Sequence, residues 1–168
     1  MLYIKTLDTD SPNARHEGGT ELLKSALLEE YGLEIEASDI LRGEHGKPYI
    51  NENGVHFSIS HCKDRAAVLL SPYPCGVDIE RIRPINPAVI SRVCTEKEKA
   101  FIGDSARRFA LIWTLKESYV KAIGRGLGLG LKNVEFTVNG DKITSNLGGE
   151  FKTMELDDFI VSYCIKKD

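Results

Sequence analysis

The order of predicted elements in this 168-residue chain indicates an α+β fold. A strand-like apolar run at residues 2–7 precedes a segment at residues 20–31, in which apolar side chains recur at helical spacing up to Gly32. Strands, then helices, then strands follow. This order lacks the regular strand–helix alternation of a doubly wound sheet, so the predicted class is α+β.

Turn residues and helix caps divide the rest of the chain. Asn86 before Pro87 marks a helix start, and Thr95 with Glu98 forms a capping-box pattern. The remaining predicted elements are a helix at 105–123, a glycine-rich hinge or substrate-approach loop at 124–130, and strands at 55–60, 66–71, 76–80, 134–138, 142–144 and 159–165, of which the first three form an antiparallel meander.

The composition is typical of a globular protein. Hydrophobic residues make up 42% and charged residues 28% of the chain, and the formal net charge of -3 predicts no general affinity for nucleic acid or membranes. No apolar stretch reaches membrane-spanning length and no secretory leader is visible, so we expect one cytoplasmic domain. No Cys-x-x-Cys pair occurs, and free thiols are expected at Cys62, Cys75, Cys94 and Cys164.

Two acidic residues alternate with apolar ones in the segment that begins at Gly76. Because strand side chains alternate between faces, Asp78 and Glu80 project together while their apolar neighbours enter the core. Two carboxylates on one face suit a hard cation such as Mg²⁺ or Mn²⁺, which prefers oxygen ligands. A solvated edge strand, or neutralisation by the adjacent Arg81 and Arg83, explains the same pattern.

A third acid is predicted on a helix. Steps of four residues place Trp113, Glu117 and Lys121 on one helix face, with Lys116 beside it. One interpretation makes Glu117 a further metal ligand and Lys121 a phosphate contact, since an ammonium group offsets charge that develops in phosphoryl transfer. The alternative is a surface ion pair above a core tryptophan.

A phosphate pocket is predicted where the strand at residues 55–60 ends. Ser60 and His61 leave the sheet at its rim, and Lys47 lies in a turn that Pro48 fixes. A hydroxyl, an imidazole and an ammonium group together suit phosphate. A lone histidine of this kind is more often structural or simply exposed.

These segments, as an ordered set, resemble the signature of the 4'-phosphopantetheinyl transferases. The resemblance covers roughly residues 46–131 and implies an enzyme that transfers the phosphopantetheine arm of coenzyme A to a serine of an apo acyl or peptidyl carrier protein, with release of adenosine 3',5'-bisphosphate. The matching motifs are Gly46-Lys-Pro48, Phe57-Ser-Ile-Ser-His61, Gly76-Val-Asp-Ile-Glu80 and Trp113-Thr-Leu-Lys-Glu-Ser-Tyr-Val-Lys121.

The position of the acidic motif resembles the longer class of this family, which surfactin-synthetase activators typify. Members of that class are monomers in which two similar α+β units are fused into a pseudodimer. The resemblance therefore implies an N-terminal half at about residues 1–85, a C-terminal half at about 86–168, and an active site in the cleft between them.

Roles for individual residues are also implied by the resemblance. Asp78, Glu80 and Glu117 match the ligands of Mg²⁺ or Mn²⁺, an ion that also binds the pyrophosphate of coenzyme A. Lys121, with Lys116 beside it, matches a contact to the phosphates. The remaining implied contacts, to the nucleotide end of coenzyme A and its 3'-phosphate, are Arg15, Lys47, Pro48, Ser60 and His61.

Two features concern the carrier protein. Glu98 matches a family position assigned as the base that deprotonates the carrier serine, and a metal-bound water is the alternative base. Carrier proteins are typically acidic, so we expect docking arginines at the cleft rim, with Arg107, Arg108 and Arg125 as candidates.

The alternative function is a non-catalytic coenzyme A or nucleotide-binding domain of the same fold, which would not require all three carboxylates.

Overall fold

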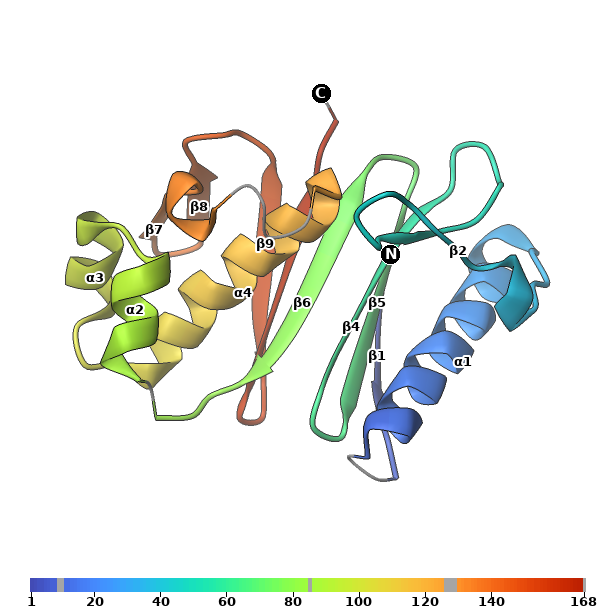
Figure 1. Cartoon of the computed structure of the whole chain (residues 1–168), viewed down its shortest axis with the longest axis horizontal. Helices are drawn as coiled ribbons and strands as arrows, with labels where there is room; N and C mark the ends of the chain where they lie inside the picture. Colours follow the sequence, from blue (N-terminus) through green and yellow to red (C-terminus); the bar gives the residue numbers. More distant parts are fainter. Residues whose placement is uncertain (9–10, 85, 126–129, 168) are drawn as a thin grey trace.

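The computed structural model describes residues 1–8, 11–84, 86–125 and 130–167. Two three-stranded antiparallel sheets form its centre, and each packs against one long helix (Figure 1). Strands, helices and strands succeed one another along the chain, which confirms the predicted α+β class. None of the helices in the described part is long and apolar enough to cross a membrane.

The first sheet has the strand order β1–β5–β4 and packs against α1. Leu23, Ala26 and Leu27 of this helix are completely buried, and they pack with Phe57 and Val68 of the sheet. The elements of this part are β1 (Leu2–Thr6), α1 (Pro12–Tyr31), η1 (Ala37–Asp39), β2 (Leu41–Arg42), β3 (Pro48–Tyr49), β4 (His56–Cys62) and β5 (Arg65–Ser71).

Helix α1 begins at Pro12, well before the predicted start at residue 20. Ser11 caps it by accepting a hydrogen bond from the Ala14 amide at 3.2 Å. Two glycines follow inside the helix, and glycine disfavours a helix interior. A side chain would be crowded there, because an added Cβ would lie 2.4 Å from the Leu7 side chain at Gly18 and 3.0 Å from the Ile59 side chain at Gly19.

The second sheet has the strand order β6–β10–β9 and packs against α4. The predicted meander is thus confirmed only for the β4–β5 hairpin, because β6 pairs with β10. Strand β9 was not predicted, since most of its side chains are exposed and give no alternating apolar pattern. The elements of this part are β6 (Cys75–Arg81), α2 (Pro87–Val93), α3 (Glu96–Ile102), α4 (Ala106–Ile123), η3 (Leu131–Asn133), β7 (Phe136–Asn139), β8 (Lys142–Ser145), β9 (Glu150–Leu156) and β10 (Phe159–Ile165).

The sequence signals in the helical middle of the chain are confirmed. Asn86 caps α2 with Pro87 in its first turn, and Thr95 and Glu98 form the capping box of α3. Helix α4 ends at Ile123, as predicted, and begins at Ala106, one residue after the predicted start. The glycine-rich loop expected after it lies largely outside the described residues, because positions 126–129 are not among them.

Strands β4 and β6 lie side by side where the two sheets meet (Figure 1). They belong to different sheets, and serine side chains make the connection between them. The Val77 amide donates to Ser58 Oγ at 3.0 Å, and the Ile79 amide donates to Ser60 Oγ at 3.3 Å. Both contacts span 19 residues, so the two strands run parallel and the end of β4 meets the acidic face of β6.

Gly76→Ala is expected to lower the free energy of unfolding by about 3 kcal/mol or more. A Cβ at Gly76 would lie 2.0 Å from Ser118 O and 2.5 Å from Ala122 N, and these backbone atoms of α4 have little room to move. Urea unfolding measures the loss. Gly43→Ala is the control, because a Cβ there would meet its nearest neighbour at an ordinary 3.6 Å. Equal losses in both variants would contradict the close approach of β6 to α4.

Candidate active site

Asp78 is the buried centre of the candidate site. Only 5% of the residue is exposed, and its Oδ1 accepts hydrogen bonds from Ser60 Oγ at 2.8 Å and from Lys121 Nζ at 2.7 Å. The second oxygen, Oδ2, is buried without a hydrogen-bond partner in the described part of the chain. An unpartnered buried carboxylate oxygen is costly, so a cationic ligand at this atom would be stabilising.

Ser60 and Lys121 hold Asp78 from two different elements. The Ser60 hydroxyl donates to Asp78 and accepts from the Ile79 amide and from Lys121 Nζ at 2.9 Å, which uses its full hydrogen-bonding capacity. Lys121 Nζ also donates to Val77 O at 3.1 Å, so its three donors all have acceptors within the protein. A phosphate contact to Lys121 must therefore replace one of these bonds.

Glu80 and Glu117 are half-buried near Asp78. Burial raises the pKa of both glutamates above the ordinary value, and the negative charge of Asp78 raises each pKa further. The described residues contain no group of three or more His, Cys, Asp and Glu side chains placed to hold a metal ion. The structure thus brings the three carboxylates within electrostatic reach of one another without forming a closed ligand set.

The chemistry of these carboxylates nevertheless fits a hard divalent cation. Oxygen donors are what Mg²⁺ and Mn²⁺ prefer, and Mg²⁺ commonly binds one or two carboxylates together with substrate phosphates and water. The partnerless oxygen of Asp78 and the raised pKa values of Glu80 and Glu117 both mark a place where a positive charge would be stabilising.

Glu117→Gln is expected to stabilise the metal-free protein at neutral pH. Because the pKa of Glu117 is raised in the folded state, its contribution to stability falls as pH rises from the ordinary pKa through the raised one. The variant cannot ionise, so its advantage in free energy of unfolding should grow across that window and be smallest in acid. Urea unfolding over a pH series with a chelator tests this, and a difference that does not change with pH would contradict it.

A cavity of about 260 Å³ joins several of the predicted nucleotide contacts to the acidic site. Lys47, Pro48, Glu117 and Lys121 all line it. Lys47 Nζ donates to Cys75 O at 3.0 Å and to Ala122 O at 3.1 Å, and burial lowers the pKa of this lysine. The turn that carries Lys47 and Pro48 is thereby fixed to the start of β6 and the end of α4.

Positive groups gather around His61. Burial lowers the pKa of this histidine most, and the nearby charges of Arg15, Lys121 and His16 lower it further. Arg15 Nε is buried without a hydrogen-bond partner among the described residues. Basic side chains gathered in one place, one of them with an unused donor, suit an anion such as a phosphate group. His16 was not predicted, although it directly follows Arg15 in the sequence.

Glu98 and Lys116 lie elsewhere, in the core between α3 and α4. The residues are 1% and 0% exposed and form an ion pair at 2.8 Å. Glu98 also accepts from the amides of Thr95 at 2.8 Å and Phe136 at 2.9 Å, and Lys116 Nζ donates to Leu131 O at 2.9 Å. The structure does not bring this pair to the carboxylates, and its complete burial supports a structural role.

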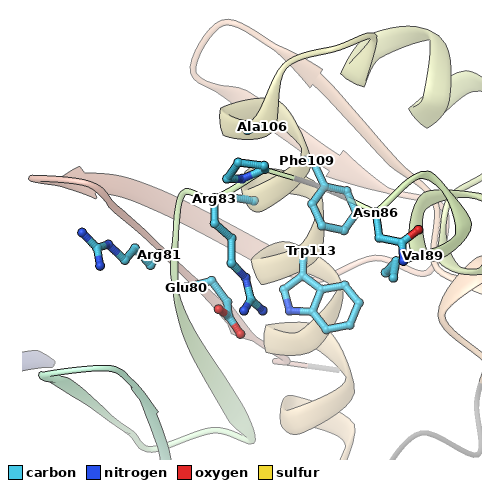
Figure 2. Close-up of a pocket in the computed structure, with 10 residues that line it drawn as sticks. Glu80, Arg81, Arg83, Asn86, Val89, Ala106, Phe109 and Trp113 are labelled. Atoms are coloured by element: carbon cyan, nitrogen blue, oxygen red, sulfur yellow. The ribbon is translucent and has the colours of Figure 1, made fainter. Parts of the chain in front are cut away.

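A second cavity, of about 290 Å³, begins at Glu80 (Figure 2). Figure 2 shows the side chains of Glu80, Arg83 and Trp113 converging there. Trp113 is half-buried and packs against Phe109 with ring centroids 6.0 Å apart. The tryptophan expected in the core therefore also forms a cavity wall beside the acidic face of β6.

The three predicted docking arginines differ in their surroundings. Arg107 forms an ion pair with Glu155 at 2.6 Å. Arg108 donates to Phe101 O at 3.0 Å and lies over the Phe101 ring. Arg125 is exposed. Two of the three arginines thus have intramolecular partners, and the role of all three in docking stays a prediction.

Comparison with known proteins identifies the family. A model of the 4'-phosphopantetheinyl transferase superfamily matches residues 74–164, which is more than half of the chain, and the chain belongs to this superfamily. A 4'-phosphopantetheinyl transferase, gsp, from Aneurinibacillus migulanus is 32% identical over 114 residues, covering 65% of this chain and 48% of the relative. The 4'-phosphopantetheinyl transferase Sfp from Bacillus subtilis (strain 168) is 28% identical over 129 residues, which cover 73% of this chain and 58% of that relative.

The chain spans about half the length of the curated relatives it matches. Among solved structures, the Thermotoga maritima holo-[acyl-carrier-protein] synthase matches with a TM-score of 0.49 and 22% sequence identity, covering 55% of this chain and 62% of that chain.

Proposed function

We propose that this protein transfers the 4'-phosphopantetheine arm of coenzyme A to a serine of an apo acyl or peptidyl carrier protein and releases adenosine 3',5'-bisphosphate. The observation that carries the proposal is Asp78, which Ser60 and Lys121 hold through one oxygen while its other oxygen is buried and unpartnered. Glu80 and Glu117 lie near it. Membership in the superfamily supports this activity.

In this proposal Asp78, Glu80 and Glu117 hold Mg²⁺, or Mn²⁺ in its place. The bound cation would neutralise charge on the pyrophosphate of coenzyme A, which develops further as the phosphoanhydride bond breaks. Lys121 adds a second positive charge beside the pyrophosphate. It would do so by exchanging one of its intramolecular acceptors for a phosphate oxygen.

The nucleotide end of coenzyme A is proposed to occupy the cavity that Lys47 and Pro48 line. Arg15 and His61 would bind its 3'-phosphate, because Arg15 has an unused buried donor and both belong to one positive cluster. Ser60 contributes indirectly, since its hydroxyl is fully used in holding Asp78 and Lys121.

The pantetheine arm is proposed to enter the cavity of Figure 2. Trp113 and Phe109 give that cavity an apolar wall, which suits a chain of amide and methylene groups. Glu80 lies at its edge, so the arm would lead away from the carboxylates. The carrier serine would then attack the phosphorus that bears the arm, with positioning supplying much of the rate.

The proton of the attacking serine is proposed to pass to a water molecule that lies beside the three carboxylates. Glu98 is an unsuitable base in this arrangement, because it is buried and both of its oxygens accept hydrogen bonds from backbone amides. A candidate base must reach the proton that it removes, directly or through one water.

We also propose that the chain is a cytoplasmic monomer built as a pseudodimer, with halves at about residues 1–85 and 86–168. Each of its two three-stranded sheets packs against one long helix, which supports two related units. Strand β6 precedes the proposed boundary but pairs with β10 of the second sheet, so the two units would be interlocked through β6.

Carrier-dependent release of adenosine 3',5'-bisphosphate tests the function. The protein is incubated with coenzyme A and Mg²⁺, with and without a panel of apo-carrier proteins, and the products are separated by chromatography. We expect release only in the presence of a carrier and loss of release with a chelator. Coenzyme A binding without release for any carrier would instead favour a non-catalytic binding domain.

A further inference from the structure

Three small polar side chains of β4 face β6: Ser58, Ser60 and Cys62. Alternate residues of a strand project from one face, which places the three in a row. Ser58 contacts the backbone of β6, whereas Ser60 donates to Asp78 and Cys62 donates to Glu80. The last two contacts both span 18 residues. Strand β4 therefore supplies one hydrogen-bond donor to each carboxylate of β6.

Each donor engages one oxygen of its carboxylate. Ser60 Oγ lies 2.8 Å from Asp78 Oδ1, and Cys62 Sγ lies 3.3 Å from Glu80 Oε2. Asp78 Oδ2 is buried and unpartnered in the described part of the molecule. A carboxylate that is held by one oxygen presents the other in a fixed direction, and partners of this kind strengthen metal binding by orienting the ligand.

Glu80 depends on its β4 donor more than Asp78 does. Asp78 is also held by Lys121 at 2.7 Å, and it is buried. The Glu80 side chain has one more torsion than that of Asp78 and is only half-buried. It lines the cavity of Figure 2, where Arg83 points toward Glu80. Among the described residues, Cys62 is the hydrogen-bond donor to its carboxylate.

We propose that Cys62 is a positioning residue whose thiol orients the Glu80 carboxylate for binding a divalent cation. This inference rests on the cation site of the proposed function and adds a residue outside the motifs that predict that site. A thiol is a weak donor, and a serine hydroxyl can form the same contact. The role therefore belongs to the donor at position 62, so the conservative variant should preserve it.

Mn²⁺ binding to the purified full chain, followed by electron paramagnetic resonance without coenzyme A, tests the proposal. Cys62→Ala is expected to weaken Mn²⁺ binding by about tenfold, the lower end of the effect of removing a partner that orients a metal ligand. Cys62→Val fills the position with a somewhat larger apolar side chain that has no donor and should show the same weakening, whereas Cys62→Ser should bind like the wild type.

Ser58→Ala is the matched control, because it removes a hydrogen bond of the same row that goes to the Val77 backbone and to no carboxylate. It should lower the melting temperature and leave Mn²⁺ affinity unchanged. Wild-type affinity in both Cys62→Ala and Cys62→Val would overturn the role of Cys62 and leave the proposed function intact. Equal weakening in Ser58→Ala would also overturn it, by showing a general loosening of β4 against β6. A wild-type chain that binds no Mn²⁺ would overturn the cation site itself.

Discussion

Asp78→Asn is expected to lower the rate of phosphopantetheine transfer by at least about a hundredfold, equivalent to roughly 3 kcal/mol of transition-state stabilisation. The substitution keeps the size of the side chain and removes the charge that pairs with Lys121 and would bind the cation. Steady-state transfer rates, measured over a series of Mg²⁺ concentrations, give the loss.

The matched control is Asp141→Asn, since Asp141 is an exposed residue between β7 and β8 and lies outside the site. It should transfer at the wild-type rate. Circular dichroism and a melting curve establish that Asp78→Asn is folded. A folded Asp78→Asn protein with full activity and unchanged Mg²⁺ dependence would exclude Asp78 from the cation site.

Lys116→Met is expected to lower the free energy of unfolding by about 3–5 kcal/mol, the usual effect of removing one partner from a buried ion pair. The substitution leaves the Glu98 carboxyl group 1% exposed and without its cationic partner. It also leaves two backbone acceptors, Leu131 O and Val134 O, without their donor. Urea unfolding measures the loss.

A double-mutant cycle with Glu98→Gln separates the ion pair from the other contacts of Lys116. The amide oxygen introduced by Glu98→Gln would still accept one backbone hydrogen bond, so Lys116→Met with Glu98→Gln should be more stable than the sum of the two single losses predicts. Strict additivity would contradict a coupled pair. The pH–rate profile of Glu98→Gln adds a second readout. Replacing a catalytic base would remove the limb of the profile that reports its ionisation, and replacing a structural residue would not.

Local patterns were sufficient to predict the strand and the helix that carry the three carboxylates. Strand alternation predicted that Asp78 and Glu80 share a face, and helical spacing predicted that Glu117 and Lys121 do. Both rules describe a single element, so neither reports how two elements meet. The hydrogen bonds of Ser60 and Cys62 to residues 18 positions away depend on the parallel packing of β4 beside β6, for which a single sequence carries no direct signal.

The start of α1 was missed for a different reason. Gly18 and Gly19 lower helix propensity in the missed segment, and the cap signal of Ser11 before Pro12 did not enter the prediction. The glycines instead let the helix pack closely against the side chains of Leu7 and Ile59, a tertiary contact that local propensity does not report. Likewise, the capping box predicted the start of α3 correctly, but the Glu98 oxygen that completes the box, Oε2, also pairs with Lys116 in the core, and the other oxygen accepts from the Phe136 amide of β7.

Intact-mass spectrometry of an apo-carrier protein, after incubation with this protein, coenzyme A and Mg²⁺, tests the central claim most directly. We predict that the carrier gains the mass of one phosphopantetheine group, that a carrier with its acceptor serine replaced by alanine gains none, and that Asp78→Asn protein produces little gain in the same time. An unchanged carrier mass across acyl and peptidyl carriers, with a folded protein that binds coenzyme A, would contradict the proposed transfer.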